Sequence, residues 1–393
     1  MAKKLSIVER MMKKSSNPYA NKILDCAIYD VKNYYDTGNY MQNLQVSGSI
    51  RGGWPAGRIV ELSGDSQTGK SFFVMNSLIN FLRLNKKNIV VLFETEGAII
   101  SKKLKPVLSE DENERFMVLP VKYHEDLGRQ TAEQIEMIRE IKTEDPEVNF
   151  FVCLDSLGMC SPKKQYENFI KGKEVKVMSE QSMIKSYFNL IKLPFAEYDV
   201  AFLYTNHIYE NFMNTYGHVA EFKKKKTRGG QGVEYCPDIK LRLTQKDLRE
   251  VEGVKADNMY INKSNDQLNN ITGVKVYVIP MKSREFAKNI AKIELNIRFK
   301  VGMDKYSGLF EFLQAHKLIE KSVAGAKGTK IRIPEIDYEF FTNDLKGKSK
   351  DEFWNETILN YIEKKFNEFY LLESQKETTI EDDLNKKEIE DNE

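Results

Sequence analysis

Apolar and polar residues follow a regular order along the first half of the chain, in which short apolar runs alternate with longer amphipathic stretches. The runs have the length of buried strands, and the stretches between them carry apolar residues at helical spacing. The runs cover residues 57–64, 88–94, 149–156 and 199–206, and the stretches cover residues 72–84, 131–142 and 178–195. This order favours a mainly parallel sheet with helices on both faces, so we expect an α/β fold.

The pattern changes after about residue 235. Some later segments alternate apolar and polar residues, as antiparallel strands do, and others have helical spacing. The alternating segments are residues 238–245, 274–280 and 292–299, and the helical ones are residues 308–321 and 352–370. Residues 1–45 are mostly helical in pattern and mixed in charge. We therefore predict a small helical N-terminal arm or domain at 1–45, a core at 46–305, a smaller C-terminal region at 306–372 and a disordered tail at 373–393.

Composition narrows the class of protein. The chain has 393 residues, of which 41% are hydrophobic and 30% charged, so we expect a soluble globular protein. Its cysteines are scattered, which argues for a reducing cytoplasm and against a disulfide framework or a zinc site. They are Cys26, Cys153, Cys160 and Cys236. No apolar run approaches the roughly 20 residues of a membrane span, and the first residues lack the apolar segment of a secretion signal.

Charge is unevenly distributed along the chain. The net charge is +2, but residues 373–393 alone carry −6, which leaves +8 on the rest. A basic body suits a polyanionic partner. The acidic tail would compete with that partner or recruit another protein, or it serves only solubility.

One glycine-rich stretch carries a specific chemical signal. Gly64, Gly69, Lys70 and Ser71 form the pattern G-x-x-x-x-G-K-S between an apolar run and a helical stretch. In that setting the loop amides and the helix N-terminus bind phosphates, the lysine reaches the β- and γ-phosphates, and the serine binds Mg²⁺. The expected cofactors are thus ATP and Mg²⁺; the alternative is an ordinary turn with incidental glycines. The expected nucleotide-binding residues are Gly64, Asp65, Ser66, Gln67, Thr68, Gly69, Lys70, Ser71 and Phe72.

Polar side chains follow the other apolar runs where those runs end. Because ligands bind beyond the carboxyl ends of parallel strands, these residues should gather at one edge of the sheet. Asp155 is the expected Mg²⁺ ligand beside Ser71, unless it caps a helix. Glu96, rather than Glu94, is the expected general base for an attacking water, although both could be surface charges. His207 could sense the γ-phosphate or be an ordinary structural histidine.

The segment from 208 to 232 combines basic and aromatic residues with little periodicity. Basic residues follow a phosphate backbone and aromatic residues stack on bases, so we predict a loop that binds DNA. The alternative is a solvated charge run. The expected DNA-binding residues are Lys223, Lys224, Lys225, Lys226, Arg228, Gly229 and Gly230.

Taken together, these motifs resemble the RecA family, specifically the phage UvsX-type recombinases. The resemblance rests on residues 45–71, 90–99, 150–159, 202–210, 227–243 and 282–321. It implies a RecA-like P-loop NTPase core and a DNA-dependent ATPase that forms helical filaments on single-stranded DNA and exchanges strands with a homologous duplex. It further implies a single-strand-binding protein and a recombination mediator or loader as partners. Its expected location is the cytoplasm of an infected bacterial host.

The resemblance also assigns roles to individual residues. Glu96 matches the catalytic glutamate and His207 the γ-phosphate sensor. The segments 157–184 and 208–232 match the two DNA-binding loops. Lys282 and Arg284 match a basic pair that reaches the ATP of the neighbouring subunit. Lys103 stands where many family members place a tyrosine against adenine, and the N-terminal aromatic residue that docks on a neighbour has three candidates, Tyr29, Tyr34 and Tyr35.

Three other functions share part of this pattern. A hexameric helicase with the same core would form closed rings and unwind duplex DNA. A filament accessory protein or paralogue would bind DNA but hydrolyse ATP poorly, which the presence of Glu96 disfavours. A P-loop kinase would need a lid over an acceptor substrate, and residues 208–232 are poorly suited to one.

Overall fold

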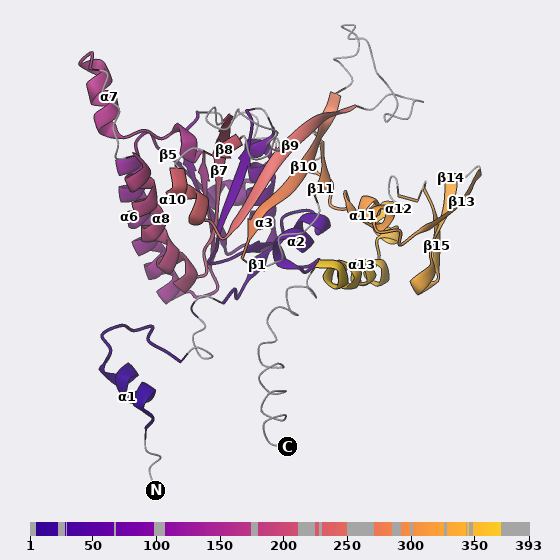
Figure 1. Cartoon of the computed structure of the whole chain (residues 1–393), viewed down its shortest axis with the longest axis horizontal. Coiled ribbons are helices and arrows are strands. Elements are labelled where there is room, and N and C mark those ends of the chain that lie inside the picture. Colours follow the sequence, from indigo (N-terminus) through magenta and orange to yellow (C-terminus); the bar gives the residue numbers. More distant parts are fainter. Residues whose placement is uncertain are drawn as a thin grey trace, which may run out of the picture.

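A computed structural model of the protein shows a long central sheet with helices on both faces (Figure 1). It describes residues 5–22, 28, 30–66, 68–97, 107–173, 180–210, 225–227, 230–249, 271–284, 292–298, 302–325, 328–342, 344–345 and 349–370. The strands of the sheet are β3 (Ile59–Gly64), β4 (Asn88–Glu94), β5 (Phe116–Pro120), β6 (Asn149–Asp155), β7 (Ala201–Glu210), β8 (Lys225–Thr227), β9 (Ile239–Arg249), β10 (Ile271–Ser283), β11 (Ile293–Arg298) and β12 (Gly302–Met303).

The sheet is mixed and mostly parallel. Its order is β12-β11-β10-β9-β3-β7-β6-β4-β5, and β8 pairs with the end of β7. The strands from β9 to β5 run parallel to one another, whereas β10, β11 and β12 are joined by antiparallel pairing. This confirms the α/β fold with a mainly parallel sheet. The segments predicted as antiparallel strands extend the same sheet beyond β3, so the strand that ends at Gly64 is central.

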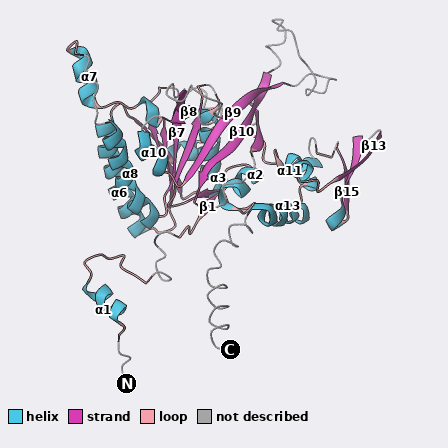
Figure 2. Ribbon diagram, viewed as in Figure 1, coloured by secondary structure: helices cyan, strands magenta, loops and turns pink. Residues whose placement is uncertain are grey.

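Helices cover both faces of the sheet and bury one apolar cluster on each (Figure 2). On one face α6 and α8 lie side by side (Figure 1), and on the other lie α2 and α3. The helices of this part are α2 (Tyr40–Ser47), α3 (Lys70–Leu84), α5 (Glu110–Glu114), α6 (His124–Glu144), α7 (Lys163–Ile170), α8 (Glu180–Glu197) and α10 (Gly230–Tyr235), with a 3₁₀ turn at Leu157–Met159. None of the helices in the described ranges combines the length and the apolar character of a membrane span.

The C-terminal region has more strands than its sequence pattern predicts. The helix predicted at 308–321 is α11 (Leu309–Ala315), which stops before Lys317, whose φ of 55° is left-handed. The chain then forms a three-stranded antiparallel sheet of β13 (Glu320–Gly325), β14 (Gly328–Ile333) and β15 (Tyr338–Phe341), with a 3₁₀ turn at Pro334–Ile336. The helix predicted at 352–370 is two helices, α12 (Ser349–Phe353) and α13 (Glu356–Tyr370), because Asn355 caps the second one.

The N-terminal segment begins with a short exposed helix, α1 (Ile7–Lys14), which buries none of its residues. Two short strands, β1 (Tyr34–Tyr35) and β2 (Trp54–Pro55), then pair beside the core. Tyr35 is buried against Phe81, so it is the wrong candidate for docking on a neighbour. Tyr34 is exposed, and Tyr29 and the acidic tail lie outside the described residues. The four domain ranges remain predictions.

Phe81 on α3 is central to the packing of this helix. It is fully buried, with ring centroids 4.7 Å from Tyr35 and 5.4 Å from Phe151. We expect Phe81→Ala to lower the free energy of unfolding by about 3–5 kcal/mol, because it leaves a cavity between α3 and the sheet. Leu84→Ala, on the same helix but 48% exposed, should cost well under about 1 kcal/mol. Urea unfolding would measure both, and equal losses would contradict this account.

Candidate functional site

The turn from β3 into α3 has the backbone that a phosphate-binding loop requires. A Cβ atom on Gly64 would lie 2.6 Å from Thr68 Oγ1 and 2.9 Å from the Leu243 carbonyl oxygen, so only glycine fits. Gly69 has a φ of 81° and no side chain with which to cap the first amides of α3. Those amides and the positive end of the helix dipole therefore face the space where an anion would bind.

The remaining loop residues shape the turn. Thr68 Oγ1 donates a hydrogen bond of 2.9 Å to the Asp65 carbonyl oxygen. Ser66 is exposed, and Phe72 packs against the apolar cluster on the α3 face. Gln67 lies outside the described residues. The loop is thus closed by its own hydrogen bonds.

Lys70 extends its side chain back over this loop. Its Nζ donates to the carbonyl oxygens of Gly64, at 3.0 Å, and Asp65, at 2.9 Å, and the residue is 6% exposed. Burial lowers the pKa of Lys70, while the carboxylates of Glu96, Asp155 and Asp65 oppose this change. The ammonium group is therefore held by two carbonyl oxygens that it could exchange for phosphate oxygens.

Ser71 and Asp155 form the expected metal-binding pair. Ser71 is in the first turn of α3 and Asp155 ends β6, and their side chains are hydrogen-bonded to each other. Thr205 on β7 also donates to the Asp155 carboxylate. Burial raises the pKa of Asp155, although these two hydrogen bonds oppose the rise. Hydroxyl and carboxylate oxygens are ligands that Mg²⁺ accepts together with phosphate oxygens, so this pair fits the metal.

Glu96 lies beside these groups, in the turn after β4. Its Oε1 accepts a hydrogen bond of 2.5 Å from Ser156 Oγ and lies 2.9 Å from His207 Nε2. Burial alone would raise its pKa, but the hydrogen bonds with Ser156 and His207 and the charge of Lys70 hold the pKa below its usual range. The carboxylate is therefore ionised at neutral pH, as a general base must be.

Removing the Ser156 hydroxyl should change the pH dependence of any reaction that needs ionised Glu96. The hydroxyl lowers the pKa of Glu96, so Ser156→Ala should raise it. The rate falls as pH drops through this pKa, hence the acid limb of the kcat–pH profile should move to higher pH. Steady-state hydrolysis measured from neutral pH to well below pH 4.5, the ordinary pKa of a glutamate, would show the shift, and an unmoved acid limb would contradict the role of Ser156.

Glu94 stabilises the backbone of the turn that carries Glu96. It is buried at the end of β4, and its carboxylate accepts hydrogen bonds from the backbone amides of Glu96, at 3.1 Å, and Gly97, at 2.9 Å. It thus holds the turn that presents Glu96. Sequence reasoning missed this role and also missed Ser156 and Thr205; only the position of Ser156 directly after Asp155 signalled any of them.

Lys282 and Arg284 lie away from this group of residues. In the register of the sheet Lys282 of β10 is opposite Lys240 of β9, and Lys240 is opposite Glu61 of β3. Glu61 precedes Gly64 by three residues, so Lys282 is level with a point on β3 about 10 Å before the phosphate-binding loop. Lys282 Nζ donates to the carbonyl oxygens of Tyr235 and Pro237, at 2.9 and 2.7 Å. Arg284 forms an ion pair of 2.9 Å with Asp238.

The basic pair belongs to a larger cluster of positive charge. Burial raises the pKa of the Cys236 thiol, and the charges of four cations around it oppose the rise. These cations are Lys192, Lys282, Lys185 and Arg284. Burial lowers the pKa of Lys282, and the nearby charge of Arg284 lowers it further. A cluster of cations of this kind suits an anionic partner.

The basic segment is only partly described. Lys225 and Lys226 are in β8, which pairs antiparallel with the end of β7, three residues or fewer beyond His207. Gly230 begins α10, where the sequence pattern predicted irregular structure. The expected residues that lie outside the described ranges are Lys103, Lys223, Lys224, Arg228 and Gly229. The segment 157–184 contains α7, whose Tyr166, Phe169 and Ile170 are exposed.

The chain is similar in sequence to known recombination proteins. No family model matches the chain. It is 23% identical over 302 residues to a recombination and repair protein of Enterobacteria phage T4, and this alignment covers 77% of this chain and 68% of the phage protein. It is 22% identical over 338 residues to Protein RecA of Mycoplasma mycoides subsp. mycoides, with 82% and 87% covered, and 22% identical over 273 residues to Protein RecA of Clavibacter michiganensis. The resemblance that the motifs indicate is thereby confirmed.

Proposed function

Because the chain is a distant relative of the RecA-family recombinases, we propose that it is an ATP-dependent recombinase of the phage UvsX type. It forms helical filaments on single-stranded DNA, hydrolyses ATP when DNA is bound, and pairs and exchanges strands with a homologous duplex. The observation that carries the proposal is the meeting of Lys70, Glu96 and His207 at one edge of the sheet. The sequence contributes these residues from three segments far apart along the chain.

Each of these residues has a role in hydrolysis. The α3 amides and Lys70 bind the phosphates, and Ser71 and Asp155 hold Mg²⁺, which supplies positive charge to the phosphate oxygens when bound. Glu96 orients a water molecule and accepts its proton. Ionised Glu96 is in place for this step because its pKa is held low.

His207 connects hydrolysis to DNA binding. Its Nε2 lies 2.9 Å from Glu96, and the strand that carries it continues directly to the pairing with β8. A hydrogen bond from His207 to the γ-phosphate would compete with the contact to Glu96 and shift the end of β7. This shift would change the conformation of the basic segment 208–232. The segment would bind single-stranded DNA tightly in the ATP-bound state and more weakly after hydrolysis.

Besides the ATP site, filament formation would use the groove between α6 and β5 of one subunit and the helix α1 of the next. A cavity of about 430 Å³ lies between α6 and β5, lined by apolar residues that include Phe116, Met117 and Ile138. In the described chain β5 pairs only with β4, so this edge of the sheet is open. We assign it to α1 of a second copy, whose Ile7, Val8 and Met11 are 50–68% exposed. Charge supports this match, since α1 has three basic residues and one acidic, whereas α6 has six acidic and three basic.

Three further partners are part of the proposal. Duplex DNA is the second substrate of strand exchange, and a single-strand-binding protein and a mediator or loader assist assembly. The acidic tail is a suitable contact for such a protein because its charge is opposite to that of DNA-binding surfaces. The place of action is the cytoplasm of an infected bacterial host.

The decisive experiment combines hydrolysis, assembly and strand exchange in the wild-type protein. We expect ATP hydrolysis that single-stranded DNA stimulates, open helical filaments in electron micrographs, and exchange between a circular single strand and a homologous linear duplex. Closed rings with unwinding activity would favour the helicase. DNA binding with negligible hydrolysis would favour the accessory protein, and hydrolysis independent of DNA would favour the kinase.

A further inference from the structure

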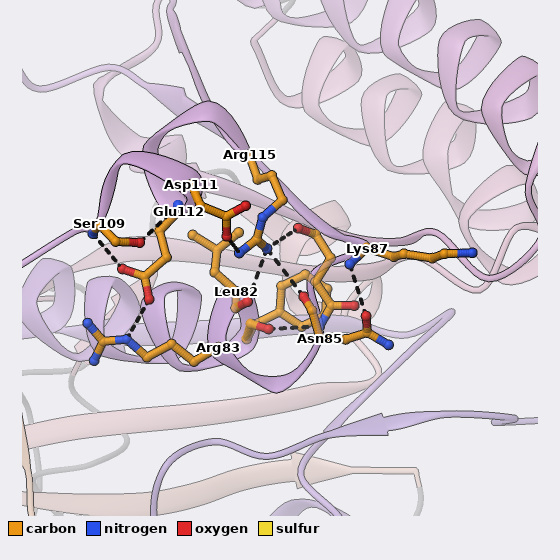
Figure 3. Close-up of polar contacts among 10 residues, drawn as sticks. Leu82, Arg83, Asn85, Lys87, Ser109, Asp111, Glu112 and Arg115 are labelled. Atoms are coloured by element: carbon orange, nitrogen blue, oxygen red, sulfur yellow. Dashed lines mark hydrogen bonds and ion pairs between the residues drawn. The ribbon is translucent and has the colours of Figure 1, made fainter.

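Arg115 occupies a position that no step of the proposed mechanism uses. It directly precedes the edge strand β5, and its side chain reaches the C-terminal end of α3 (Figure 3). Its Nη1 donates to the carbonyl oxygens of Leu82, at 3.0 Å, Asn85, at 3.2 Å, and Asn88, at 2.9 Å. Its Nη2 donates to Asp111 Oδ2 at 2.7 Å. One guanidinium group therefore joins the C-terminal end of α3, at Leu82 and the capping residue Asn85, and the start of β4, at Asn88, to the residue that leads into the edge strand.

These contacts fix the far end of the helix that begins with the phosphate-binding loop. The last carbonyl groups of a helix have no intrahelical partners and carry the negative end of its dipole, so a guanidinium bound there is strongly held. α3 has 15 residues and is about 22 Å long. Its buried residues, such as Phe73 and Phe81, pack it tightly, so a shift at one end moves the other.

The same residue faces the open groove. Arg115 lines the cavity between α6 and β5 together with Glu114 and Gln134. Its Nε is buried and has no hydrogen-bond partner among the described residues. Beside it, Met117 and Val118 of β5 are 41% and 43% exposed. A segment lying in the groove would therefore contact Arg115 directly.

We propose that Arg115 is a positioning residue for the nucleotide site, which couples occupation of the α6–β5 groove to the phosphate-binding end of α3. The proposal rests on the proposed function in taking α1 of a second copy as the occupant. When α1 fills the groove, Arg115 is held in place and in turn fixes α3, so nucleotide binds more tightly. By linkage, bound nucleotide strengthens the docking of α1 by the same factor.

The neighbouring Arg83 provides a matched control. It lies at the same end of α3, and its Nε donates to Glu112 Oε1 of α5 at 2.8 Å. Among the described residues its guanidinium also donates to the Val107 carbonyl oxygen rather than to the last carbonyl groups of α3, and Arg83 does not line the cavity. Arg83→Met thus removes the same charge from the same cluster (Figure 3) without breaking the proposed connection.

The test measures nucleotide affinity in the full-length protein, diluted below its assembly concentration and without DNA. A fluorescent ATP analogue is titrated with and without a saturating synthetic peptide of residues 1–22, whose binding is followed separately by anisotropy. In the wild type and in Arg83→Met we expect the peptide to tighten nucleotide binding about 5-fold or more. In Arg115→Met the peptide should still bind, but nucleotide affinity should not respond to it.

A second variant keeps the test valid if Arg115→Met does not fold. Asp111→Asn removes only the exposed carboxylate that orients the guanidinium, and it should reduce the response without abolishing it. An unchanged response in both variants, a peptide that does not bind, or a wild type whose affinity ignores the bound peptide would each overturn the proposal. A wild type that binds no nucleotide at all would instead refute the proposed function.

Discussion

Replacing Lys282 and Arg284 together with alanine is expected to lower DNA-stimulated ATP hydrolysis by about 10³-fold or more. By register Lys282 lies about 10 Å behind the phosphate-binding loop of its own chain. Arg284, whose amide donates to the Asp238 carbonyl oxygen, lies farther back, so both cations would act on the ATP of a neighbour. Such cations would approach the γ-phosphate only in an assembled filament, where they stabilise charge in the transition state. Their removal should therefore leave ATP binding by the isolated subunit unchanged. Hydrolysis with single-stranded DNA, beside nucleotide binding without DNA, would measure the two effects.

A mixing experiment separates action in trans from a structural defect. A subunit lacking the cations still has Glu96, and a Glu96→Gln subunit still has the cations, so some junctions in a mixed filament are complete. With random assembly about a quarter of the junctions should be active, because each junction is formed head to tail by two different surfaces. An inactive mixture would contradict the trans contact, and Lys330→Ala, an exposed cation of the C-terminal sheet, serves as the charge control.

Glu96→Gln is expected to lower ATP hydrolysis by about 10²–10⁴-fold while nucleotide and DNA binding persist. Glutamine has the same shape and can keep the hydrogen bond from Ser156, but it cannot accept a proton from water. The variant should therefore form filaments that remain stable in ATP. Steady-state hydrolysis and filament lifetime by light scattering would measure both properties.

The control for Glu96→Gln removes a charge of the same kind elsewhere. Glu133→Gln, an exposed residue of α6, should hydrolyse ATP at the wild-type rate. If Glu96→Gln retained more than about a tenth of the wild-type rate, another group would have to be the general base.

The sequence was sufficient for the α/β class and for the local signals of the candidate site. The run 88–94, the run 149–156 and the stretch 178–195 became β4, β6 and α8 with their ends shifted by two residues or fewer. Such elements are set by the period of their apolar residues, which is a local property of the chain. The pattern G-x-x-x-x-G-K-S is local in the same way, since its glycines are required by the backbone of one turn.

Other features depended on residues that are distant in the sequence. The apolar spacing of residues 308–321 predicts one helix, yet Glu320 and Lys321 begin the strand β13, because β14 supplies their hydrogen-bonding partners. The role of Glu94 depends on the turn at Glu96 and Gly97, and the contact between Glu96 and Ser156 joins two strands. No sequence pattern indicated a role for Arg115, because an arginine before a short strand is common. Its role depends on the end of α3, which only the fold brings next to it.

The set of elements and the chemical identity of the loop that begins α3 therefore follow from local sequence alone. Which side chains meet depends on the fold, because the strand order β9-β3-β7-β6-β4 brings Lys70, Asp155 and His207 to one edge and leaves Lys282 away from it. Apolar periodicity sets the burial of each element separately. The order of strands is fixed by the packing of all elements together, which no local segment encodes.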